Sequence, residues 1–160
     1  MKWVIMLLLL TPIFLIYSSW NHDEALQTKL KAQLKDGMDL ATHDASLQIL
    51  QEELEKGSIK FNPLEAQKVL RQSMQTSFKL DGLLKPLPGG IWLNDFDLVW
   101  FELVESGVFP QVYHSGPPYY YSDTLKGPSV IAIVKVKHPR YYGVSDTFDY
   151  VVGSSHEYVR

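Results

Sequence analysis

A run of apolar residues at the N-terminus constrains this chain more than any other feature of its sequence. Residues 3–17 are apolar except for Thr11 and Pro12, and no charged side chain follows Lys2 until Asp23. A helix without a polar face is found in lipid more often than in the core of a small domain. The run therefore predicts a segment that enters a membrane.

The length of this run fits a short membrane span. Its roughly 15 residues would make a helix of about 22 Å, whereas the hydrocarbon core of a bilayer is about 30 Å thick. Extension through Trp20 gives roughly 18 residues, with Trp3 and Trp20 at the two ends, where interfacial aromatic side chains are found. Lys2 precedes the run and no basic residue follows closely. This asymmetry predicts an N-terminus inside the cell and the rest of the chain outside.

Removal of the segment as a signal peptide is the alternative. A cut near Ser18 or Ser19 would place Ile16 or Tyr17 three residues before the cleavage site. Signal peptidases prefer small residues at that position. We therefore favour a retained single-pass anchor of the cell membrane at 1–20, and keep secretion after cleavage as the alternative.

Composition limits the remaining possibilities. The 160 residues suffice for one domain and an anchor, and 46% hydrophobic with 21% charged residues is ordinary globular usage. The net charge is −3 without a basic block, so we predict no nucleic-acid partner. The absence of cysteine excludes disulfides, thiolate metal sites and cysteine lipidation.

Residues 21–57 predict a long amphipathic helix that continues the membrane segment. Apolar side chains recur at helical spacing, and Gly57 lies where a helix commonly ends. This apolar stripe has to be buried, either against the sheet of the same chain or against other helices. Its two rows are Leu26, Leu30, Leu34 and Met38, which step by four, and Leu40, Leu47 and Leu54, which step by seven with Leu50 beside them.

A second helix and several strands are predicted within 58–160. Asn62 is expected to cap the helix, with Pro63 at its first position, Glu65 at its third and an end near Leu80. Its apolar face would carry Ala66, Val69, Leu70, Ser73, Met74 and Phe78. Strands are expected at 96–104, 112–114, 119–121, 130–137, 147–152 and 155–159, the last two as a pair about Gly153 and Ser154.

Helices followed by strands indicate an α+β fold. We expect a long N-terminal helix, consisting of the membrane segment and its amphipathic continuation, then a second helix and a C-terminal antiparallel sheet. Strand 130–137 should be central, because both of its faces are apolar at first. The predicted organisation is an anchor at 1–20, an amphipathic helix at 21–57 and an extracytoplasmic domain at 58–160.

No group of residues meets the requirements of an active site. Asp39 and His43 share one helix face, but no third ligand is tied to them by spacing, and the five histidines are scattered singly. We predict no catalytic residue, no cofactor-binding residue, no metal site and no enzymatic activity. Solvated positions are expected for the carboxylates that bracket strand 96–104, namely Asp95, Asp97, Glu102 and Glu105.

Two tyrosine clusters are the candidate interaction surface. Tyrosine rings bury much area at small entropic cost, which suits contact with a protein or a glycan. The alternative is that these rings cover the sheet, since aromatic residues are common in strands. The candidates are Tyr119, Tyr120 and Tyr121, which follow a Pro-Pro pair, and Tyr141 and Tyr142.

The order of these segments resembles a known family. A short apolar N-terminus precedes LKDGMDLATHDASLQI, then GSIKFN and SFKLDG, and the chain closes with LKGPSVIAIVKVKHPRYYG and EYVR. The chain resembles the small pilin-like membrane proteins that accompany tight-adherence (Tad) pilus machinery in Gram-positive bacteria. The resemblance implies a minor-pilin or pilus-assembly accessory role, with the N-terminal helix as the packing element, and it supplies no binding residues.

The expected function is protein–protein assembly in the cell envelope. Membrane lipid would contact the N-terminal segment, and the protein partners would be envelope or pilus proteins, among which further copies of the chain are one option. The alternative is a secreted binding module that uses the tyrosine-rich loops to contact a surface or cell-wall ligand.

Overall fold

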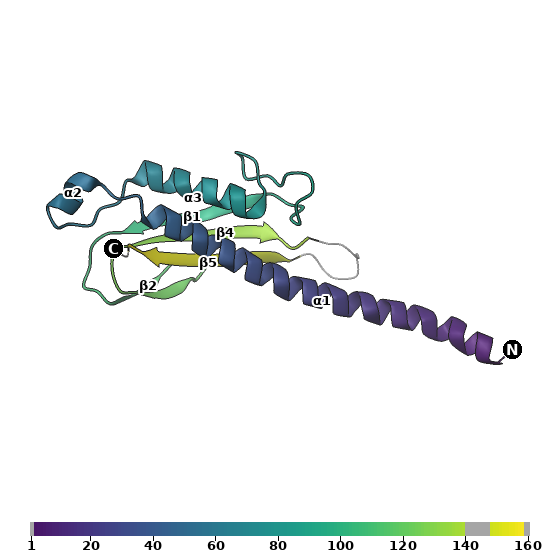
Figure 1. Ribbon diagram of the computed structural model, residues 1–160. Coiled ribbons are helices and arrows are strands. Elements are labelled where there is room, and N and C mark those ends of the chain that lie inside the picture. The colour runs from purple at the N-terminus through teal and green to yellow at the C-terminus, as the bar shows by residue number, and fades with distance from the viewer. Residues whose placement is uncertain (1, 140–147, 159–160) are drawn as a thin grey trace.

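The computed structural model describes residues 2–139 and 148–158. Helices come first and strands follow, which confirms the predicted α+β fold (Figure 1). The helices are α1 (Lys2–Ser46), α2 (Gln51–Glu55) and α3 (Pro63–Phe78). The strands are β1 (Phe96–Val104), β2 (Gln111–His114), β3 (Ser122–Leu125), β4 (Ser129–Lys137) and β5 (Asp149–Glu157).

Helix α1 joins the apolar N-terminal segment and the domain without a break. Its N-terminal half extends away from the rest of the chain, and its C-terminal half lies across the sheet beside α3 (Figure 1). Leu30, Leu34 and Met38 are fully buried in one core with α3, β4 and β5. The first apolar row therefore faces the sheet of its own chain, and the C-terminal half of α1 shares one core with α3, β1, β4 and β5.

The predicted continuation of this helix to Lys56 is wrong. Helix α1 ends at Ser46, and the chain then runs extended beside the segment that precedes α3. The Leu50 N–H donates to the Lys60 carbonyl at 2.8 Å, and the Asn62 N–H donates to the Gln48 carbonyl at 2.8 Å. These two bonds replace the helical ones, and a separate short helix, α2, follows.

The second apolar row is not part of the core. Leu40 is 50% exposed, and Leu47 and Leu50 are also exposed. The inner face of α1 continues instead through small residues, which let the helix lie close to the sheet. These buried residues are Ala41, Thr42, Ala45 and Ser46.

Helix α3 begins as its sequence predicts. The Asn62 side chain accepts a hydrogen bond from the Glu65 N–H at 3.3 Å, and Pro63 opens the helix. The helix ends at Phe78, because Lys79 adopts a left-handed conformation with φ 56°. Its buried face consists of Ala66, Leu70, Met74 and Phe78, which are four of the six predicted residues.

The main sheet has the order β1-β4-β5, with both pairs antiparallel. Strand β4 is central as predicted, and its Val130, Ala132, Val134 and Val136 side chains face the helices. Strand β1 has the predicted bounds, Phe96–Val104. The central strand therefore has a full-length neighbour on each side.

The predicted pair of closing strands is wrong, because β5 is one continuous strand. Gly153 and Ser154 lie opposite Ile133 and Ala132 of β4 rather than in a turn. The Ser154 hydroxyl contacts Thr42 at 2.9 Å and donates to Asp39 at 2.5 Å, which fixes this part of the strand to α1.

Strands β2 and β3 form a separate antiparallel pair. This hairpin lies on the face of the main sheet opposite the helices. The Tyr113 hydroxyl accepts from the Trp100 indole at 3.0 Å and donates to the Glu102 carboxylate, which ties the hairpin to β1. The expected strand at 119–121 is wrong, because those residues lie in the turn before β3. The predicted strand 112–114 is confirmed within β2.

Candidate functional site

The exposed apolar half of α1 is the largest candidate surface of the described chain. By length and composition, α1 is long and apolar enough to cross a membrane. Residues 2–20 would span about 28 Å at 1.5 Å per residue, close to the roughly 30 Å hydrocarbon thickness. The exposed side chains include Trp3, Leu7, Leu8, Leu9, Leu10, Ile13, Phe14, Leu15, Ile16, Tyr17 and Trp20.

Two residues within this segment affect its hydrogen bonding. The Thr11 hydroxyl donates to the Leu7 carbonyl at 2.7 Å, so this polar group is satisfied inside the helix. Pro12 lies in the helix and has no N–H to donate to the carbonyl of Leu8. The apolar helix therefore carries one backbone acceptor that its own ladder does not satisfy.

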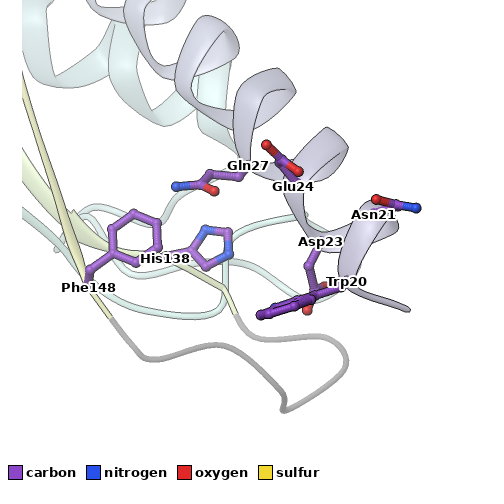
Figure 2. A pocket seen from close by; sticks show the side chains of 7 residues that line it. All are labelled: Trp20, Asn21, Asp23, Glu24, Gln27, His138 and Phe148. Carbon is purple, nitrogen blue, oxygen red and sulfur yellow. The ribbon is translucent and has the colours of Figure 1, made fainter. Parts of the chain in front are cut away.

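A cavity lies where α1 enters the domain. It has a volume of about 360 Å³ and lies between α1 and the ends of β4 and β5 that face the N-terminal half of the helix (Figure 2). Aromatic, acidic and amide side chains meet here. The lining residues are Trp20, Asn21, Asp23, Glu24 and Gln27 of α1, with His138 after β4 and Phe148 before β5.

The His138 side chain forms the inner wall of this cavity. It is 4% exposed, and its ring stacks on that of Phe148 with 4.8 Å between centroids. The Tyr150 hydroxyl lies 2.9 Å from His138 Nδ1 and donates to the Gln27 carbonyl at 3.3 Å. Burial lowers the pKa of His138, and the negative charge of Asp23 opposes that shift. The ring is therefore a buried neutral imidazole at neutral pH.

Asp23 is the buried acid of the cavity. Its side chain is 7% exposed, and Oδ2 has no hydrogen-bond partner among the described residues. A buried carboxylate oxygen without a donor costs folding free energy. The arrangement therefore places a carboxylate with one unsatisfied oxygen in the wall of the cavity.

Acidification is expected to destabilise the folded chain through His138. An unfolded histidine titrates near pH 6.5, whereas the folded pKa is lower. As the pH falls below about 6.5, the unfolded state binds a proton that the folded state does not, so the free energy of unfolding decreases. Urea unfolding of the full-length protein in detergent, between about pH 7.5 and about pH 5.5, measures this loss.

A matched pair of variants identifies the group responsible. His138→Gln should reduce the pH dependence over this range, whereas His114→Gln changes an exposed histidine and should leave it intact. An unchanged slope in His138→Gln would show that another group causes the loss.

The tyrosine candidates do not form one surface in the described residues. Tyr120 is 74% exposed, and Tyr119 is half-buried. The Tyr121 ring lies against Gly153, its hydroxyl donates to Asp123 at 2.8 Å, and burial raises its pKa. Tyr121 therefore covers the sheet, as the alternative interpretation predicted. Tyr141 and Tyr142 lie outside the described residues.

Asp39 and His43 each contact other side chains of the domain. Asp39 pairs with Lys35 and accepts from Ser154, while the His43 ring packs against His156 with 4.5 Å between centroids. Of the carboxylates near β1, Asp95 and Asp97 are exposed as expected, whereas Glu102 and Glu105 are partly buried and accept hydrogen bonds. Glu102 accepts from Trp100 and Tyr113, and Glu105 accepts from the Phe61 N–H at 2.8 Å.

Sequence reasoning did not find the cavity. In the sequence, Asp23 is the first charge after the apolar run, and His138 is one of five scattered histidines. Their meeting requires the register of β4 and the position of α1 across the sheet, which no local pattern encodes. The sequence offers one signal, an acid a few residues after the apolar run.

Comparisons of the chain with protein-family models, with curated proteins and with solved structures give no match. The resemblance to pilin-like membrane proteins therefore remains a hypothesis. It is carried by the quoted segments and by their order along the chain.

Proposed function

We propose that this protein is a single-pass membrane protein that acts without catalysis, by assembling with other envelope proteins through its N-terminal helix and its extracytoplasmic domain. The observation that carries the proposal is the continuity of α1, which is apolar and exposed in its first half and buried in the domain core in its second. A rigid helix without a linker fixes the orientation of the domain relative to the membrane. A minor pilin or pilus-assembly accessory would require this property.

Two features support assembly rather than anchoring alone. The Leu8 carbonyl lacks its helical donor because of Pro12, and in lipid such a group is commonly satisfied by a neighbouring helix. The resemblance to pilin-like proteins likewise implies packing through the N-terminal helix. Both favour contacts between apolar helices within the membrane.

The intact mass of the mature protein in fractionated cells tests the anchor. We expect a full-length mass in the membrane fraction that resists extraction by high salt and alkaline carbonate, because roughly 20 apolar residues partition strongly into lipid. A mass shorter by roughly 18 to 20 residues in the medium would contradict the anchor and favour the secreted binding module.

Disulfide cross-linking tests assembly, and the absence of cysteine makes each introduced thiol unique. Single cysteines at Leu7, Leu8, Leu9 and Leu10 should give cross-linked products in membranes at positions on one side of the helix only. Leu64→Cys, at a position 80% exposed on α3, is the control for random collision. Cross-linking at no helix position, or equally at all of them and at residue 64, would contradict assembly through this helix.

A further inference from the structure

We propose that the cavity at the base of the domain binds the primary ammonium group of a lipid headgroup of the phosphatidylethanolamine class. The inference rests on the proposed membrane anchoring, because the lipid has to be adjacent to α1. It adds a binding site that neither the anchor nor the assembly hypothesis requires. The cavity wall supplies acceptors, negative charge and aromatic faces (Figure 2).

The acceptors come from two different segments of the chain. The first is the buried Asp23 carboxylate, whose Oδ2 lacks a donor among the described residues. The second follows from the bonding of His138. The Tyr150 hydroxyl lies 2.9 Å from His138 Nδ1 and 3.3 Å from the Gln27 carbonyl. When its single proton goes to the carbonyl, its oxygen accepts from His138 Nδ1–H. A neutral imidazole protonated at Nδ1 has an acceptor at Nε2.

These acceptors fit a primary ammonium better than a quaternary one. A primary ammonium has three N–H donors, whereas a choline headgroup has none. Choline would gain the attraction of the carboxylates and of the aromatic faces of Trp20 and Phe148, as any cation would, but it could form no hydrogen bond to the acceptors. Glu24 adds a second carboxylate to the lining, so an anionic headgroup without an ammonium group is disfavoured. The site should therefore select ethanolamine over choline and glycerol headgroups.

The height of the cavity fits the headgroup layer. Asp23 follows Trp20 by three residues, which is about 4.5 Å along the helix. The polar layer on each side of the hydrocarbon core is about 5 to 7 Å thick. With Trp20 at the membrane interface, Asp23 lies at the depth of the headgroup amine. A lipid beside α1 could reach the cavity without leaving the bilayer.

Native mass spectrometry of the full-length protein, released from detergent micelles, tests the site. Phosphatidylethanolamine, phosphatidylcholine and phosphatidylglycerol with identical acyl chains are titrated in parallel. We expect phosphatidylethanolamine to bind at least about tenfold more tightly than the other two, as loss of a charge-assisted hydrogen bond implies. Asp23→Asn should weaken its binding by a similar factor, whereas Asp36→Asn, at an exposed position on the same helix, should not.

Equal affinity for the three lipids, or unchanged phosphatidylethanolamine binding in Asp23→Asn, would overturn the proposal. Free ethanolamine is titrated separately, and binding of the free amine without selection of the lipid would overturn the assignment to a headgroup. The lipid comparison uses the unaltered chain, so it remains decisive if a variant fails to fold. Membrane fractionation of the same proteins separates this result from the anchor, since anchoring does not require Asp23.

Discussion

Leu34→Lys is expected to unfold the domain that α1 forms with α3 and the sheet. Leu34 is 0% exposed and lies in the core that α1 shares with α3 and the sheet. The substitution removes an apolar side chain that typically contributes about 2 to 5 kcal/mol and buries an ammonium group that costs several kcal/mol more. The sum approaches the roughly 5 to 15 kcal/mol that stabilises an ordinary domain. Circular dichroism and limited proteolysis of the full-length protein in detergent would detect the loss.

Leu40→Lys is the matched control for this variant. It makes the same chemical change on the same helix at a position 50% exposed, and should change the free energy of unfolding by less than about 0.5 kcal/mol. A Leu34→Lys protein that folds but fails to assemble would mean that this row faces a neighbouring molecule. One that folds and assembles normally would contradict the core described for α1.

The sequence predicted this core face because helical periodicity is a local signal. Leu30, Leu34 and Met38 lie one turn apart, and a buried helix needs an apolar row at that spacing. The end of α1 could not be predicted in the same way. No proline or glycine marks Ser46, and the pairing of residues 48–50 with 60–62 overrides a helical pattern that continues past it.

The same distinction separates β1 from β5. The β1 segment is rich in aromatic and branched residues, so its bounds could be predicted from composition alone. Gly153 and Ser154 look like a turn, because small residues are common there. Here the glycine accommodates the Tyr121 ring, and the serine bonds to Thr42 and Asp39 of α1. These residue types are explained by tertiary contacts. The contacts are apparent only once the segment before β3 and helix α1 are placed against β5.

The candidate site shows most clearly what local sequence patterns do not predict. The anchor was predicted because it is continuous in sequence. The cavity joins Asp23 to His138, which are more than a hundred residues apart, and its chemistry depends on Tyr150 and Gln27 as well. Each of these residues is ordinary alone. Their arrangement around one cavity becomes apparent only when burial and hydrogen bonding are known.

Gly37→Ala should destabilise the domain, although the same change usually stabilises a helix interior by about 1 kcal/mol. A methyl group at this position would lie 2.5 Å from Phe78 Cε1 and would also collide with Cζ. The ring cannot move freely, because it stacks on Phe96 and meets Trp92 edge-on. Overpacking of this kind costs about 1 to 3 kcal/mol, which exceeds the helical gain. Urea unfolding in detergent measures the difference.

A double-mutant cycle separates this steric cause from any other effect of alanine. Phe78→Leu shortens the side chain that meets Gly37, so Gly37→Ala should cost at least about 0.5 kcal/mol less in that background than in the native one. Gly82→Ala, at a glycine with open space around its Cα, should be nearly neutral. If Gly37→Ala instead stabilises the protein, or costs the same in both backgrounds, α1 does not approach α3 as closely as the contact with Phe78 requires. The orientation of the domain on α1 would then have to be revised, because that orientation depends on the packing of α1 against α3 and the sheet.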